Sequence, residues 1–263
     1  MEHVDVDGTQ IAYTRAGDGP AVVLLHGAPS DSRVWQWVVP DLATDHTVVA
    51  WDAPGFGRSS DIDDGWRSRR FADALAAFVA VLGLERPHVI GHSFGTMVAL
   101  SLFRHHPAVP ASLVLVGGYA GWAGSLPADE VARRLKMFVG MAELGDAFDP
   151  KSYPGLFSDL VPADRDAALV ALMRENLRPE TIRAAGHTGA ETDLRPVLPT
   201  VDVPTLVLHG EVDARSPLAN AEALHAAIPT SQLVVLPGLG HACLVEDPQA
   251  CVAEIRRFVG TVG

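Results

Sequence analysis

The chain has 263 residues, of which 48% are apolar and 20% are charged, a balance typical of a globular protein and not of a disordered one. Its 32 acidic residues outnumber its 20 basic residues and give a net charge of −12, which excludes nucleic acid as an expected partner because a phosphate backbone would be repelled. Two cysteines are too few for a disulfide framework, and no apolar run approaches the ~20 residues that a membrane-spanning helix needs.

The beginning of the chain shows no targeting signal. Residues 1–8 are polar and acidic, without the basic stretch and apolar run of a signal peptide. We therefore expect a soluble, cytoplasmic protein with no membrane partner. The length exceeds the usual ~100–150 residues of a domain, but single α/β domains often reach it. We predict one core with an inserted lobe.

Strand and helix patterns alternate through the first part of the chain. Runs rich in valine and leucine, which suit strands buried on both faces, alternate with segments whose apolar residues have helical spacing. The predicted strands are 9–14, 21–25, 47–51, 88–91 and 113–116, and the predicted helices are 31–42, 70–84 and 95–105. This alternation predicts an α/β fold in which a parallel sheet carries helices on both faces.

The pattern changes between residues 119 and 195. Here helical segments follow one another with no convincing strand between them, at 127–144, 163–177 and 179–185. The alternation then resumes, with strands predicted at 204–209 and 232–236 and a final helix at 248–259. We therefore predict that residues 1–118 and 196–263 form the core and that 119–195 are inserted as a helical cap.

A serine lies between a predicted strand and a predicted helix. The segment GHSFG at residues 91–95 joins the strand 88–91 to the helix 95–105. Small residues around Ser93 allow the strained turn that would raise its hydroxyl above the sheet. The amide of Phe94, at the helix N-terminus, can then stabilise a negatively charged oxygen. The five-residue pattern alone is a weak signal, but its context predicts that Ser93 is a nucleophile.

A serine hydroxyl needs a base, and the base needs a group that orients it. Asp213 and His241 each follow a predicted strand, so they should lie at the same carboxyl edge of the sheet as Ser93. The chain order of serine, acid and histidine also fits a hydrolase. We predict His241 as the base and Asp213 as the orienting acid. Two alternatives stay open, Asp213 as an ordinary turn residue and Glu211 as the acid.

The segment HGAP at residues 26–29 follows the predicted strand 21–25. Its loop can place the amide of Ala28 opposite that of Phe94, so we predict these two backbone N–H groups as an oxyanion hole. A plain turn of glycine and proline is the alternative. His26 is expected to form structural hydrogen bonds and not to act as a base.

Metal and phosphate sites are not expected. The sequence has no HExxH or CxxC motif, and the glycine-containing segment 52–59 lacks the lysine of a phosphate-binding loop. We therefore predict neither a metal nor a cofactor. Residues 52–59 are expected to form a turn that borders the site.

Taken together, these motifs resemble those of the α/β-hydrolase superfamily over nearly the whole chain. The segments that carry the resemblance are HGAP, DAPGFGRS, GHSFG, GEVDARSP and GLGHACLVEDP. The resemblance implies an eight-stranded, mostly parallel sheet whose second strand runs antiparallel, with the helical cap over Ser93. It also implies acyl transfer without a cofactor, in which Ser93 attacks a carbonyl, His241 shuttles the proton and water releases the acyl enzyme.

Within the superfamily, a serine at position 93 disfavours the dehalogenases and epoxide hydrolases, which carry aspartate there. The chain is similar to esterases and enol-lactonases, so the expected reaction is hydrolysis of a carboxylic ester or lactone of a small, largely apolar substrate. Carbon–carbon bond hydrolysis of the meta-cleavage type is an alternative, although Ala242 and Cys243 stand where those enzymes usually carry tryptophan. A perhydrolase side activity and a hydrolase-like ligand receptor also stay open, as do a monomer and a homodimer.

The cap should decide the substrate. Apolar and aromatic residues are candidates for the pocket, but the same spacing is typical of cap core. The candidates in the cap are Trp122, Met137, Phe138, Met141 and Phe157, and better candidates are Trp35 and Phe94, which are tied to loops at the active edge of the sheet. Arg133, Arg134 and His187 are candidates for a polar anchor.

Overall fold

The computed structural model describes residues 1–155 and 160–262. Within this part of the chain eight strands form one sheet, in the order β1-β2-β4-β3-β5-β6-β7-β8. The strands are β1 (Glu2–Val6), β2 (Thr9–Ala16), β3 (Ala21–Leu25), β4 (Thr47–Trp51), β5 (His88–His92), β6 (Ser112–Val116), β7 (Thr205–Gly210) and β8 (Ser231–Leu236). β2 pairs antiparallel with both β1 and β4, and every other pairing is parallel. The predicted fold class is confirmed.

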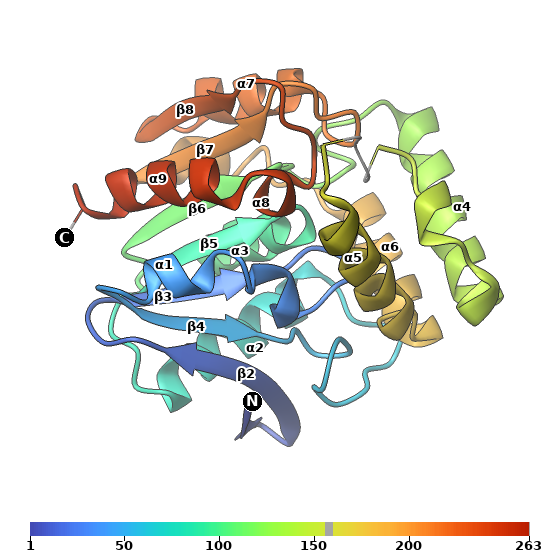
Figure 1. Ribbon diagram of the computed structural model, residues 1–263, viewed down its shortest axis with the longest axis horizontal. Helices are drawn as coiled ribbons and strands as arrows, with labels where there is room; N and C mark the ends of the chain where they lie inside the picture. The colour runs from blue at the N-terminus through green and yellow to red at the C-terminus, as the bar shows by residue number, and fades with distance from the viewer. Residues whose placement is uncertain (156–159, 263) are drawn as a thin grey trace.

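Successive residues of a strand point to opposite faces of the sheet, and here both faces carry apolar side chains. Helices therefore cover both faces. In β3, Val23 and Leu25 pack in one core cluster, and Val22 and Leu24 pack in the other. The first cluster is covered by α2 (Ser68–Val81), α3 (Phe94–His105) and α7 (Leu218–Ala227). The second is covered by α1 (Val39–Leu42), α8 (Cys243–Glu246) and α9 (Pro248–Val259), and Figure 1 looks onto this second face.

Three further helices lie beyond the carboxyl ends of the parallel strands, where the arrows point in Figure 1. They are α4 (Ala128–Leu144), α5 (Ala163–Glu175) and α6 (Pro179–Glu191), called the cap helices below. The remaining short turns are 3₁₀ helices, η1 (Ser32–Trp35), η2 (Gly145–Ala147), η3 (Pro150–Ser152) and η4 (Leu198–Thr200). No strand occurs among the described residues between β6 and β7, in line with the predicted helical insertion.

The sequence prediction lacks α7 and α8, and three further elements differ from it. The helix expected over 31–42 is divided into η1 and α1, because Pro40 lacks the N–H that a continuous helix would need. α6 runs on to Glu191 although Gly186 and Gly189 lower its helical propensity. The polar start of the chain forms the edge strand β1, in which only Val6 is buried.

The glycines of α6 allow close packing with the segment before α4 and with α4 itself. A Cβ atom at Gly189 would lie 2.6 Å from the Trp122 ring, and one at Gly186 would lie 2.7 Å from Phe138 Cβ. Tertiary contact therefore stabilises helical backbone where local propensity is poor. Among the described helices, none is both long and apolar enough to cross a bilayer.

Candidate active site

Ser93 occupies a strained turn between β5 and α3. Its backbone has φ +51° and ψ −110°, a region that a residue other than glycine rarely adopts. The turn is so tight that neither Gly91 nor Gly95 could carry a side chain. A Cβ atom would lie 2.5 Å from Gly95 C at Gly91 and 2.2 Å from Leu25 O at Gly95. A hydrogen bond of 2.9 Å from the Ser93 amide to the Val116 carbonyl also ties the turn to β6.

Asp213 follows β7 and His241 follows β8, and both side chains are buried. His241 Nδ1 lies 2.8 Å from Asp213 Oδ2. The other oxygen, Oδ1, accepts hydrogen bonds from the amides of Arg215 at 2.8 Å and Ser216 at 2.7 Å. Burial alone would raise the pKa of Asp213, but the charge of His241 and these hydrogen bonds hold it below its ordinary value. An ionised Asp213 keeps the proton on Nδ1, which leaves Nε2 free to accept one.

A second histidine supports the loop of the first. His92 Nε2 lies 3.0 Å from the carbonyl oxygen of His241, and the centres of the two rings are 5.1 Å apart. Burial, together with the charge of His241, lowers the pKa of His92 to about 3. His92 is therefore neutral near pH 7 and can donate its Nε2–H to that carbonyl. This contact anchors the His241 loop to the end of β5.

Two cavities meet at Ser93. The His241 cavity encloses about 490 Å³ and is lined by Gly27, Ala28, Pro29, Ser30, Val34, His92, Ser93, Tyr153, Leu169, Met173, His241, Ala242, Leu244 and Val245. The Arg215 cavity has an empty volume of about 270 Å³, part of it open to solvent, and is lined by Ala28, Ser93, Phe94, Met97, Tyr119, Trp122, Phe138, Tyr153, Ala185 and Arg215. Ser93 lines both. Among the described residues no hydrogen bond joins Ser93 to His241, as is common in a free enzyme before the substrate tightens the site.

The two amides predicted as an oxyanion hole border these cavities. Phe94 is the first residue of α3, where an N–H group has no partner within the helix. Ala28 lines both cavities, and its amide donates to no backbone carbonyl of the described residues. The loop that carries Ala28 is fixed by His26, which bonds to the Gly27 carbonyl at 2.7 Å and accepts from the Ala53 amide at 3.0 Å. His26 is thus a structural residue, as its sequence context indicates.

The predicted pocket residues separate into two groups. Trp122 and Phe138 line the Arg215 cavity. Trp35 and Met141 are buried in the hydrophobic core and Met137 packs against it, and none of these three lines either cavity. Phe157 lies outside the described residues.

The predicted polar anchors lie elsewhere. Arg133 is exposed and pairs with Glu130 at 2.7 Å. His187 pairs with Glu191 at 2.9 Å on the outside of α6. Arg134 is buried but bonds to Glu130 and Tyr119 instead of lining a cavity. Arg215, which was not predicted, does line one of the two cavities at Ser93. Its position two residues after Asp213 is the signal that could have identified it.

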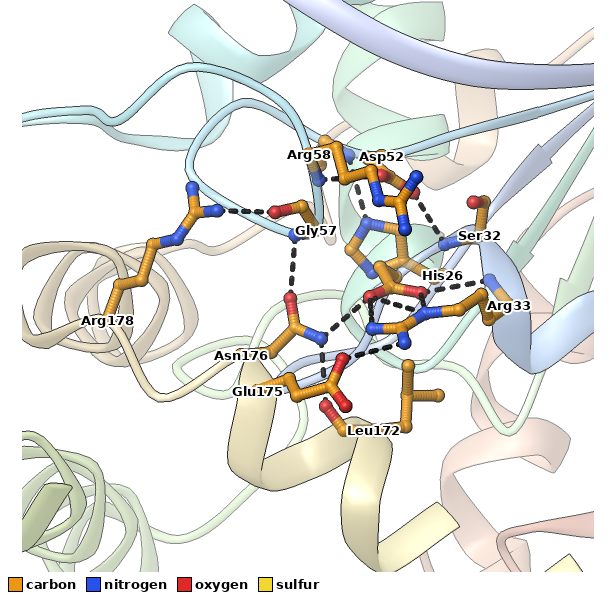
Figure 2. Close-up of polar contacts among 12 residues, drawn as sticks. His26, Ser32, Arg33, Asp52, Gly57, Arg58, Leu172, Glu175, Asn176 and Arg178 are labelled. Carbon is orange, nitrogen blue, oxygen red and sulfur yellow. Dashed lines mark hydrogen bonds and ion pairs between the residues drawn. The ribbon is translucent and has the colours of Figure 1, made fainter. Parts of the chain in front are cut away.

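A polar cluster joins α5 to the loops of the core, and Figure 2 shows it in close-up. Asn176, directly after α5, donates to Asp31 Oδ2 at 2.8 Å and accepts from the Gly57 amide at 2.7 Å. Arg178 donates to the carbonyls of Ser59 and Gly57, and Arg33 pairs with Glu175 at 2.7 Å. The segment predicted as a turn bordering the site therefore contacts the end of a cap helix. We call Asp31, Gly57 and Asn176 the Asn176 cluster.

Comparisons with known proteins identify the family and the fold of the chain. A model of the alpha/beta hydrolase family matches residues 22–254. A pimeloyl-[acyl-carrier protein] methyl ester esterase from Aeromonas hydrophila is 30% identical over 266 residues, which cover 95% of this chain and 99% of that one. A thermophilic esterase from Thermogutta terrifontis, solved with malate bound, has 28% identity and a TM-score of 0.88, covering 100% of this chain and 99% of that one.

The enol-lactonase from Burkholderia xenovorans has 22% identity and a TM-score of 0.84, covers 98% of this chain and 100% of that one, and so shares the fold. The same architecture is therefore found in a protein named as a lactonase. On the family match and the A. hydrophila relative, this chain belongs to the α/β-hydrolase family.

Proposed function

We propose that this protein hydrolyses a carboxylic ester or lactone of a small, largely apolar substrate, with Ser93 as nucleophile, His241 as base and Asp213 as orienting acid. The observation that carries the proposal is the position of Ser93. It lies on a strained turn and lines the same cavity as His241, whose Nδ1 is 2.8 Å from the buried Asp213 carboxylate. A base held in one tautomer beside a serine is the arrangement that activates a hydroxyl.

The reaction follows from these groups. Ser93 Oγ attacks the carbonyl carbon while His241 Nε2 takes the hydroxyl proton, and the imidazolium is stabilised by Asp213. The negative oxygen of the tetrahedral intermediate accepts hydrogen bonds from the amides of Ala28 and Phe94. His241 then gives its proton to the leaving alkoxide. Water, deprotonated by His241, then attacks the acyl carbon, and His241 returns that proton to Ser93 Oγ as the acid leaves.

The cavities support a small and mainly apolar substrate. Aliphatic side chains from α5 and α8 line the His241 cavity, among them Leu169, Met173 and Leu244. The relatives named as esterases, and the T. terrifontis esterase with malate bound, support an ester of a small organic acid. We also propose that 119–195 act as a cap domain over Ser93, since α5 and α6 both contribute to cavity walls.

The test is hydrolysis of p-nitrophenyl butyrate by purified wild type, Ser93→Ala and the control Ser60→Ala, whose hydroxyl accepts an exposed hydrogen bond of 3.1 Å from the Gln10 amide of β2 and lines neither cavity. We expect Ser93→Ala to lose at least ~10³-fold in kcat and Ser60→Ala to keep its rate. Wild type should release many equivalents of p-nitrophenol, whereas a ligand receptor would stop after one. Wild-type rates in Ser93→Ala would overturn the proposal.

A further inference from the structure

Arg215 places a buried cation in the wall of the Arg215 cavity. Its residue is 3% exposed, and its guanidinium Nη1 has no hydrogen-bond partner among the described residues. Nη2 donates to the Tyr153 hydroxyl at 2.9 Å. The guanidinium carbon also lies 4.6 Å from the centre of the Tyr153 ring and 5.9 Å from that of Trp122. Since both rings line the cavity, the guanidinium is held at its wall.

Neighbouring charges do not supply the missing partner. Asp213 uses its two oxygens for His241 and for the amides of Arg215 and Ser216. Arg134, the other buried arginine nearby, pairs with Glu130 at 2.6 Å and donates to the Arg215 carbonyl at 2.7 Å. Within the described part of the chain Arg215 forms no ion pair of its own. A buried cation with a free donor is best compensated by an anion that brings its own charge.

The positions of the two cavities indicate which part of a substrate meets Arg215. In the proposed reaction His241 must give a proton to the leaving alkoxide, so the alcohol part belongs in the cavity that His241 lines. The acyl chain then extends from Ser93 into the other cavity, which Arg215 and Phe94 line. That cavity is the smaller of the two, so we expect a short acyl chain there.

We infer that the preferred substrates are monoesters of short dicarboxylic acids, whose free carboxylate binds the Arg215 guanidinium while Ser93 attacks the ester. This inference rests on the proposed function and names its substrate class. Hydrolysis adds one water across the ester bond and yields the alcohol, the dicarboxylate and one proton. A planar guanidinium suits the carboxylate because its N–H groups match the two oxygens.

The experiment measures hydrolysis of two esters of similar size by chromatography of the products. It compares kcat/KM for the half ester, monoethyl succinate, with kcat/KM for the neutral ester, ethyl pentanoate. Wild type should favour the half ester. Arg215→Gln should lower the ratio of the two values by about 10- to 100-fold, mainly through KM for the half ester. Arg215→Lys should restore part of the ratio because it keeps the charge but not the fork of donors. Arg133→Gln, an exposed cap arginine, should keep the wild-type ratio.

The outcomes separate this inference from the proposed function. A wild-type preference for ethyl pentanoate, or a wild-type ratio in Arg215→Gln, overturns the inference while ester hydrolysis stands. If no ester is hydrolysed, the proposed function fails, and calorimetric titration with succinate then decides whether Arg215 binds a carboxylate. If Arg215→Gln does not fold, inhibition of the wild type is decisive: succinate should inhibit more strongly than butyrate, and equal inhibition would overturn the inference.

Discussion

Replacing Asn176 by alanine tests whether the Asn176 cluster holds α5 in place. The side chain is 1% exposed and makes hydrogen bonds to Asp31, to the Leu172 carbonyl and from the Gly57 amide. Two of these join the end of α5 to the loops after β3 and β4, and one of the two has a charged acceptor, Asp31. A neutral bond contributes ~0.5–1.5 kcal/mol and a charged one ~1.5–3 kcal/mol. Asn176→Ala should therefore lower the free energy of unfolding by about 2–4 kcal/mol.

Urea denaturation followed by tryptophan fluorescence measures this loss. Gln249→Ala is the matched control, because it removes an exposed amide with a bond to Asp41 and should cost below ~0.5 kcal/mol. Asn176→Asp should be worse than alanine at pH 7, since it sets a second carboxylate beside Asp31. The alanine variant should also raise KM because α5 carries Leu169 and Met173 into the His241 cavity. An alanine variant as stable as the control would refute the assigned role of the cluster.

Two further predictions concern the buried titratable groups. Asp213→Asn should lower kcat roughly 10⁴-fold with an unchanged circular dichroism spectrum, because the amide no longer fixes the His241 tautomer; a loss below tenfold would contradict the role of Asp213. Acid should destabilise the fold through His92, whose pKa is about 3 in the folded state and therefore below its ordinary value. The contribution of neutral His92 to the free energy of unfolding is complete above pH ~6.5 and declines as the pH falls toward 3. In this range the free energy of unfolding, measured by urea denaturation, should fall by about 1.4 kcal/mol per pH unit through this group, and His92→Gln should lack that contribution.

Much of the architecture could be predicted because strands buried on both faces have a clear pattern. Such strands are continuous runs of valine and leucine because both of their faces are apolar. The loops after them are then placed at one sheet edge by topology alone. For this reason Ser93, Asp213 and His241 could be expected near one another, and the structure puts Ser93 and His241 on one cavity and joins His241 to Asp213.

The rest depends on contacts that local sequence does not encode. α6 continues past Gly186, where Phe138 and Trp122 pack closely against its glycines and local propensity alone would not predict a helix. How the cap helices sit also decides which of their core residues reach a cavity: Met141 and Phe138 pack in the same core cluster, but only Phe138 also lines the Arg215 cavity. Arg215 was missed for a related reason: a turn arginine after Asp213 is normally solvated, and its burial between two aromatic rings is a tertiary outcome.

The contact between His92 and the carbonyl of His241 joins residues 149 positions apart in the chain. Between them the sheet must add β6, β7 and β8 in order, since each pairs only with its neighbours in the described sheet. During synthesis the site therefore stays incomplete until residue 241 has left the ribosome. Pairings this distant form late in folding because a long loop must be closed first. After unfolding, recovery of activity would thus report completion of the sheet. Recovery of the helical circular dichroism signal would report only the helices around it.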